Sequence, residues 1–146
     1  MSHVTNLAEY RALAEFRFLI RRYVSNAEKA ARSAGLAPQQ YMGLLALRGL
    51  PYGQQPTIRN LAESLQICHQ SAVELVDRMQ KRRLFVRERS QQDRRQVLVR
   101  VTPLGKRLLS RLVQPCIAEL RSTGSALVSA LSAVVARTSH RTLHGK

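Results

Sequence analysis

The stretch from Thr57 to Gly105 constrains the fold more than any other part of the chain, because two short helical patterns are followed there by two strand patterns. Thr57 stands where the first helix needs an N-cap oxygen. Apolar residues then recur at the three-and-four spacing of one buried helix face: Ile58, Leu61, Ala62 and Leu65. After a tight break the same spacing returns with Ala72, Val76 and Met79. Two helices, the break between them and a following hairpin predict a winged helix-turn-helix, with double-stranded DNA as the first partner to consider.

The second helical pattern leaves polar side chains on its exposed face. The first residues of a recognition helix must reach base edges in the major groove, so we expect DNA contacts from His69, Gln70, Ser71 and Glu74. Ordinary first-turn polar residues are the alternative for Gln70 and Ser71. The Glu74 carboxylate repels phosphate unless it accepts from a cytosine amino group or pairs with an Arg. Farther along, the cations assigned to the DNA-binding face are Arg78, Lys81 and Arg82.

The strand patterns cover Leu84–Arg89 and Gln96–Val101, where Val97, Val99 and Val101 alternate. They predict a hairpin that serves as the wing. After it, Thr102 can cap a helix that has Pro103 at its first position.

The predicted wing carries cations on its first strand and at its charged tip. Arg94 and Arg95 suit phosphate contacts or insertion into a narrow minor groove. Arg87 and Arg89 are candidate neutralisers of the DNA backbone, and a solvated face is the alternative for each. Asp93 and Arg95 can likewise be solvated charges at a turn.

The string LVDRMQKRRLFVRERSQQDRRQVLVRVTPLG closely resembles the MarR-type transcription regulators, whose wing carries Asp-x-Arg followed by a Leu-Thr-x-x-Gly-like ending. The matching positions here are Asp93 and Arg95, then Val101, Thr102 and Gly105. The resemblance implies that Arg95 reaches DNA and that Asp93 orients it. It also implies a dimeric repressor or activator, often released from DNA by a small molecule or by oxidation.

Two positions depart from that family's pattern. Arg83 stands where the family usually has the Gly that ends the recognition helix, and Gln66 stands where a turn Gly is common. A non-Gly residue in a left-handed conformation is uncommon and mildly strained.

Charge favours a polyanionic partner. Lys and Arg number 24 against 9 Asp and Glu, which gives a formal net charge of +15. Within residues 54–107, twelve Lys and Arg against five Asp and Glu leave an excess of seven. Charge alone is equally compatible with a basic protein that is merely soluble. The alternative function that we keep is a nonspecific nucleic-acid-binding basic winged-helix module.

The N-terminal part predicts a long helix from Asn6 to Ala34, with Thr5 or Asn6 near its cap and Gly35 after its end. A second helix runs from Pro38 through Leu47. Apolar residues of the long helix share one face: Leu13, Phe16, Ile20, Tyr23, Ala27, Ala30 and Ala34. One neighbour cannot cover so long a helix in so small a protein, so we expect part of it to pack against another subunit. A helix lying across its own domain is the alternative.

Beyond the wing, another apolar stripe is interrupted by Pro115. An interior proline predicts a kink or restart near Arg111–Gln114, and Ser122–Ser125 predicts a second break before a short helix over Ala126–Ala136. Arg137–Lys146 reads as a frayed basic tail. The predicted fold is therefore mainly α with a small β-hairpin wing and long terminal dimerisation helices. Its parts are supporting N-terminal helices over 1–50, the DNA-binding domain over 51–105, dimerisation helices over 106–136 and the tail over 137–146.

Other sites are weaker. Cys68 lies at the front of the recognition helix, where the helix dipole favours thiolate, so it is the one candidate redox switch; a Cys at a capping position is the favoured alternative. Cys116 lies on an apolar stripe and is expected in the core. Aromatic residues and a Met lie on helices that the MarR family packs around its effector pocket, although such residues are more often core: Tyr10, Phe16, Tyr23, Tyr41 and Met42.

The remaining patterns exclude other function classes. The histidines and cysteines have no metal-ligand spacing, and no cofactor fingerprint or nucleophile motif is present, so we expect no metal, no cofactor and no enzyme. No apolar run is long enough to span a bilayer, and two isolated cysteines favour the reducing cytoplasm. We therefore expect a homodimeric transcription regulator, a repressor, that binds a pseudo-palindromic operator. The resemblance implies that a small-molecule effector controls it.

Overall fold

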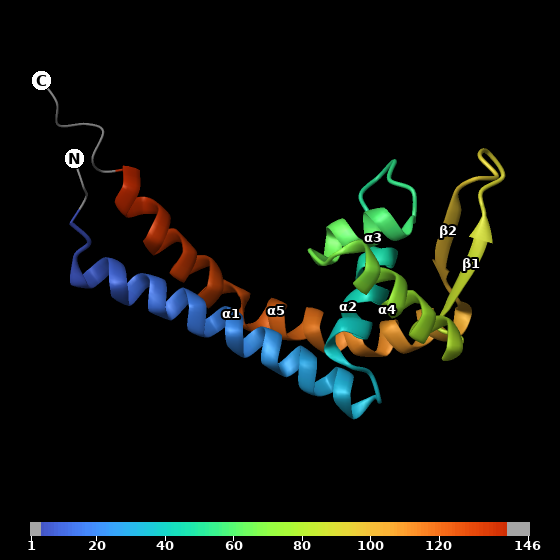
Figure 1. The fold of residues 1–146 in the computed structure, drawn as a ribbon. Coiled ribbons are helices and arrows are strands. Elements are labelled where there is room, and N and C mark those ends of the chain that lie inside the picture. The colour runs from blue at the N-terminus through green and yellow to red at the C-terminus, as the bar shows by residue number, and fades with distance from the viewer. Residues whose placement is uncertain (1–3, 140–146) are drawn as a thin grey trace, which may run out of the picture. The chain divides into compact units, whose positions relative to one another are not determined.

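The computed structural model describes residues 4–139, and Figure 1 shows their elements in order. They are α1 (Leu7–Ser33), α2 (Pro38–Arg48), α3 (Ile58–Leu65), α4 (His69–Lys81), β1 (Phe85–Arg89), β2 (Val97–Val101) and α5 (Pro103–Ser139). The predicted order of helices and hairpin is confirmed. None of the helices in this range combines the length and apolarity that crossing a membrane requires.

The chain forms two compact units. One comprises residues 28–113, and the other comprises the residues up to 27 and those from 114 onward. In the unit 28–113, α2 packs against α3, α4 and β2, and α4 packs against β1 (Figure 1). The most deeply buried large side chains of this unit come from all of these elements and from the connection before α2: Leu36, Leu44, Leu61, Val76, Met79, Phe85 and Val99.

Side-chain caps begin three of the helices. Asn6 Oδ1 accepts from the Glu9 N–H at 3.0 Å while Glu9 Oε2 accepts from the Asn6 N–H at 2.9 Å, which is a reciprocal capping box. Thr57 Oγ1 accepts from the Asn60 N–H at 3.1 Å. Thr102 Oγ1 accepts from the Gly105 N–H at 3.1 Å. The predicted caps at Thr57 and Thr102 are confirmed, and of the two alternatives for the first helix, Thr5 or Asn6, the cap is Asn6. Each side-chain oxygen satisfies an N–H that lacks a partner within the helix.

Three helices end in the same way, in a left-handed residue. After α1, Gly35 has φ +79°, after α3, Gln66 has φ +54°, and after α4, Arg83 has φ +60°. At each corner the next residue donates back to the helix: Leu36 to Ala31 O, Ile67 to Ala62 O and Leu84 to Met79 O, at 2.9 to 3.0 Å. This is the Schellman motif, whose hydrogen bonds satisfy the last carbonyls of the helix. Gln66 and Arg83 therefore follow the path that glycine favours.

The hairpin pairs Phe85 with Val101 at its base and Arg89 with Val97 at its tip. The alternating Val97, Val99 and Val101 do not all share one buried face, since Val97 is 40% exposed and the neighbouring Leu98 is buried. The cause is a bridge between Leu98 and Thr57, with the Val99 N–H donating to Pro56 O at 2.7 Å. The segment before α3 thus covers Leu98 from the side.

Helix α5 is continuous from Pro103 to Ser139. Of the predicted kink or restart near Arg111–Gln114, the restart is therefore wrong, and so is the predicted break at Ser122–Ser125. Leu112 and Cys116 are both buried, so packing on either side holds the helix despite the one hydrogen bond that Pro115 cannot make. Thr123 Oγ1 donates to Glu119 O at 2.9 Å, which keeps its hydroxyl satisfied within the helix. The first three residues of the expected tail are also helical, and residues 140–146 lie outside the described range.

In the other unit, α1 and α5 meet where Asn26 Nδ2 donates to Glu119 Oε1 at 2.9 Å. Burial raises the pKa of Tyr23 there, and the nearby Cys116 and Glu119 raise it further. Cys116 and Leu19 are buried, as expected for Cys116. Many apolar side chains of this unit nevertheless stay exposed: Leu7, Tyr10, Leu13, Phe18, Ile20, Val24, Ile117, Leu120, Val128, Leu131 and Val135.

Candidate nucleic-acid interface

Helix α4 buries one face and exposes the other. Its apolar residues Ala72, Leu75, Val76 and Met79 are buried in the core. The polar residues predicted for DNA contact are all exposed: His69, Gln70, Ser71, Glu74, Arg78, Lys81 and Arg82. An exposed polar face at the start of a helix can make hydrogen bonds to base edges or phosphates.

Cys68 is the N-cap residue of α4 and is exposed. Its Sγ lies 3.1 Å from Ser71 Oγ. A hydrogen bond from the Ser71 hydroxyl, followed by one from the Ser71 backbone, lowers the pKa of Cys68 below its usual value. The thiolate is therefore stabilised at the front of α4, which is the property that a redox-sensitive cysteine needs.

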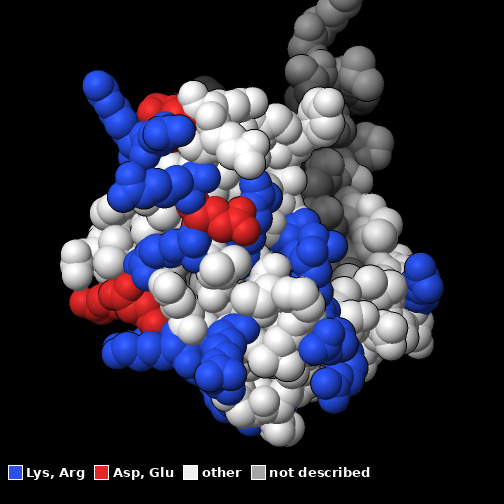
Figure 2. All heavy atoms as spheres, turned by 90° about the vertical axis from the view of Figure 1, so that its right-hand side faces the viewer, with Lys and Arg blue, Asp and Glu red and all other residues white. Residues whose placement is uncertain are grey.

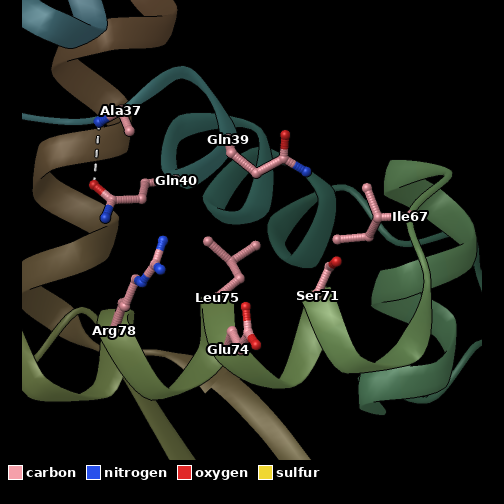
Figure 3. Close-up of a pocket in the computed structure, with 8 residues that line it drawn as sticks. All are labelled: Ala37, Gln39, Gln40, Ile67, Ser71, Glu74, Leu75 and Arg78. Atoms are coloured by element: carbon pink, nitrogen blue, oxygen red, sulfur yellow. Dashed lines mark hydrogen bonds between the residues drawn. The ribbon is translucent and has the colours of Figure 1, made fainter.

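A groove of about 330 Å³ lies between the exposed face of α4 and the start of α2. Figure 3 shows Ser71, Leu75 and Arg78 rising from α4 toward α2, where Gln39 and Gln40 lie. Glu74 and Arg78 are both on its lining, so the groove offers carboxylate, amide, hydroxyl and guanidinium groups together. Three predicted DNA-binding residues thus share one polar groove.

The tip of the hairpin is an ordered turn. Ser90, which is buried, accepts from the Gln92 and Asp93 N–H groups through Oγ, both at 3.3 Å. Asp93 Oδ1 accepts from the backbone N–H of Arg95 at 3.0 Å. Asp93 therefore shapes the backbone that carries Arg95, and its bond is to the peptide rather than to the guanidinium. Arg94 and Arg95 are exposed.

Two of the predicted cations have partners within the protein. Arg87 Nη2 lies 2.6 Å from Asp77 Oδ1, and Arg87 also donates to Gln80, so this side chain links β1 to α4. Arg82 Nη1 donates to Gly35 O and to Gln40 Oε1. Both guanidinium groups are thus held against protein acceptors.

Figure 2 views the molecule from the side on which the hairpin lies in Figure 1. Lys and Arg side chains are spread over this face, with fewer Asp and Glu side chains between them. One of the ion pairs of the hairpin joins Arg100 and Glu88 at 2.7 Å. The excess of cations gives the face a positive potential that attracts a polyanion.

The five residues suggested for an effector pocket are divided between the two units. Tyr10, Phe16 and Tyr23 lie on the part of α1 in one unit, whereas Tyr41 and Met42 lie on α2 in the other. Tyr41 is buried, while Tyr10 is 61% and Met42 45% exposed. Phe16 lines an apolar groove on α1 with Leu13, Arg17, Ile20, Arg21 and Val24. None of the other four residues lines that groove.

Sequence reasoning missed Gln39 and Gln40, which line the groove between the start of α2 and helix α4. Gln40 lies three residues after Ala37, the N-cap of α2, and its Oε1 accepts from the Ala37 N–H at 3.1 Å. The incomplete capping pattern could have indicated this local bond. No local signal points to its second bond, because Arg82 lies 42 residues farther along the chain.

Part of the chain matches a known family model, and several solved structures share its fold. Residues 34–96 match the model of the MarR family. The solved structure of AbsC, a MarR family transcriptional regulator from Streptomyces coelicolor, is similar with a TM-score of 0.70 and 19% identity, over 95% of this chain and 97% of that one. A variant of MepR from Staphylococcus aureus bound to an oligodeoxyribonucleotide is similar with a TM-score of 0.63 and 19% identity, over 84% of each chain.

A third solved structure, MepR from the same species bound to ethidium bromide, has a TM-score of 0.58 and 19% identity, over 76% of this chain and 78% of that one. No curated protein matches the chain.

Proposed function

From the MarR family match over residues 34–96 and the winged-helix fold shared with that family's transcription regulators, we propose that this chain is a sequence-specific DNA-binding transcription regulator and no enzyme. It acts as a homodimeric repressor on a pseudo-palindromic operator in the cytoplasm. The AbsC and MepR structures support the fold, and the MepR variant carries DNA on such a fold.

The observation that carries this proposal is the exposed polar front of α4 beside a basic hairpin. Gln70 and Ser71 are available for base edges, and Arg94 and Arg95 stand on an ordered tip. Because the opposite face of α4 is fully packed, the helix can enter a groove without exposing the core.

The exposed apolar residues of α1 and α5 support a dimer. Leu13 is 48%, Val24 44% and Val128 65% exposed, and a groove of about 370 Å³ runs along α1 beside Leu13 and Ile20. Apolar surface of this extent on a small protein marks an interaction site. A two-fold dimer would present its two recognition helices about 34 Å apart, which matches half-sites one helical turn apart.

A small molecule that loosens DNA binding is the control we propose for the regulator. The ethidium complex of MepR supports it, since that protein of the same fold binds an aromatic cation.

Selection from a randomised duplex library tests the main proposal. The selected duplex is then competed against bulk DNA at physiological salt. We expect a pseudo-palindrome bound about 10³-fold or more tightly than bulk DNA. Equal affinity for both would reject a regulator and favour the nonspecific basic module, which binds through phosphates alone.

A further inference from the structure

Arg82 reaches from the end of the recognition helix to the corner between α1 and α2. It is the C-cap residue of α4, and its Nη1 donates to Gly35 O at 2.8 Å and to Gln40 Oε1 at 2.9 Å. These acceptors lie 47 and 42 residues earlier in the chain. One guanidinium nitrogen therefore joins segments that are distant in sequence.

Gln40 completes the connection at the start of α2. Its Oε1 accepts from Arg82 and from the Ala37 N–H at 3.1 Å, so both lone pairs of one amide oxygen are used. Ala37 has no side-chain oxygen to cap α2, and Gln40 supplies the only side-chain bond at this cap within the described residues. Removing either partner thus affects the start of α2 and the end of α4 together.

Gly35 supplies the third part. Its left-handed conformation, φ +79°, turns the chain after α1 so that its carbonyl meets Arg82. A Cβ at this position would lie 3.7 Å from Arg82 Nη2, and a side chain there would also be strained at this φ. We call the set Gly35, Gln40 and Arg82 the helix-end clamp.

We propose that Arg82 is a positioning residue, and that the helix-end clamp sets the direction of the recognition helix and with it the choice of DNA sequence. This inference rests on the proposed function. Helix α4 has 13 residues, so it is a rod of about 20 Å. A tilt of a few degrees at its clamped end moves Gln70 and Ser71 by about 1 Å, which is enough to spoil hydrogen bonds to base edges. The clamp opposes this tilt because both of its acceptors belong to the α1–α2 corner.

The competing role is a phosphate contact by Arg82. The two roles differ in how DNA affinity depends on salt. A phosphate contact makes the fall of log affinity with log salt steeper by about 0.9, and a positioning contact leaves this slope unchanged. They also differ at Gln40, which carries no charge. A substitution of Gln40 changes the preference for the selected duplex only if the helix-end clamp sets that preference.

The test measures binding of the full-length protein to its selected duplex and to bulk DNA, at several salt concentrations. The variants are Arg82→Gln, Gln40→Leu, both together, and Gln40→Glu, which keeps two acceptor positions. Lys81→Gln is the control for lost charge, and Gln54→Leu, in the exposed loop before α3, is the control for a lost amide. Thermal unfolding gives the folded fraction of each protein.

We expect Arg82→Gln and Gln40→Leu each to lower the preference for the selected duplex about tenfold, which is about 1.4 kcal/mol, with the salt slope unchanged. The double variant should also lose about tenfold, because both changes break one clamp. Gln40→Glu should keep the parental preference. Loss of folded protein alone would lower binding to both duplexes equally, so it cannot produce this result.

A salt slope that falls by about 0.9 in Arg82→Gln, with Gln40→Leu unchanged from the parent, would overturn the clamp and identify a phosphate contact. Multiplicative losses in the double variant would overturn it as well. If the parent protein prefers no duplex over bulk DNA, the proposed function itself is rejected. That outcome is distinguishable from failure of the clamp, because it is seen before any variant is compared.

Discussion

At the scale of single residues, the candidate interface separates side chains that are free to bind from those that are held. Gln70, Arg94 and Arg95 are exposed, and no hydrogen bond or ion pair of their side chains is found within the described residues. Arg82 and Arg87 hold protein acceptors. The sequence does not distinguish an arginine that is free to bind from one that is bonded to a protein acceptor, because the fold decides which acceptors lie within reach.

The first prediction separates base reading from phosphate binding. Gln70→Ala should cost about 1–3 kcal/mol on the selected duplex and relax the preference at one base position in each half-site, because an amide can read a base edge. Arg95→Ala should weaken binding to selected and bulk DNA alike and lower the salt slope by about 0.9. Library selection with each variant gives the base preference, and Gln54→Ala is the control. Unchanged base preference in Gln70→Ala, with Arg95→Ala equal to the parent, would contradict both assignments.

The second prediction concerns Cys68, whose pKa is lowered first by the Ser71 hydroxyl. A lowered pKa means that thiolate persists to lower pH. The rate of Cys68 alkylation by iodoacetamide should therefore reach half its maximum at a lower pH than the alkylation rate of an unperturbed cysteine does. Ser71→Ala should shift that midpoint upward. Mass spectrometry distinguishes Cys68 from the buried Cys116.

The same cysteine tests redox control. We expect Cys68→Ser to bind DNA and to respond to peroxide like the parent, because a hydroxyl can cap the helix as well as a thiol. A variant that keeps DNA binding when the parent loses it in peroxide would instead establish Cys68 as a switch.

At the scale of elements, the helix ends and the junction of α5 with the hairpin determine how the helices and the hairpin are placed within the unit of residues 28–113. The corners at Gln66 and Arg83 keep the Schellman hydrogen bonds although neither residue is glycine. Gly105 occupies a closer contact, since a Cβ there would lie 2.7 Å from Leu84 O and 2.8 Å from Val101 Cγ1. The start of α5 can approach the base of the hairpin only without a side chain at this position.

The third prediction follows from that contact. Gly105→Ala should destabilise the protein by about 1–3 kcal/mol, because a backbone carbonyl cannot move aside as a flexible side chain can. Gly124→Ala in the same helix should raise stability by up to about 1 kcal/mol, since nothing lies within 4 Å of the added Cβ. Denaturant unfolding measures both free energies. Equal effects of the two substitutions would refute the proposed close approach at Gly105.

At the scale of the whole molecule, the two units differ in how completely they bury their apolar side chains. The unit of residues 28–113 has a continuous core that includes Leu44, Leu61 and Val76. In the other unit, α1 and α5 leave many apolar side chains in water. The formal charge of +15 favours a polyanion as partner but gives no reason for those apolar residues to stay uncovered.

The fourth prediction is that a second copy covers them. Sedimentation equilibrium should give a dimer at micromolar concentration, and Leu13→Glu with Ile20→Glu should give monomers, because a buried unpaired carboxylate is strongly unfavourable. Loss of the dimer in this double variant should also lower its affinity for the operator. Gln54→Glu, which adds the same charge on a distant loop, should remain dimeric. A parent protein that is monomeric and still binds a two-half-site operator with full affinity would defeat the proposal.

The sequence by itself determined the elements and most of their ends, because these depend on interactions within a few residues. Thr57 and Thr102 cap their helices as their positions predict, and the apolar spacing of α3 and α4 identifies the buried face. The exposure of Gln70 and Ser71 follows from the same spacing, because the buried residues fix the rotation of the helix.

Only the tertiary structure decided the partners of groups that local patterns leave open. Leu98 is buried because Thr57 and Pro56 lie beside its strand, and α5 stays helical through Pro115 because packed neighbours outweigh one missing hydrogen bond. Arg82 finds Gly35 and Gln40 only when the chain has closed a loop of more than forty residues. Such contacts depend on distances that no local pattern encodes, so the hydrogen bonds of Arg82 emerged from the fold alone.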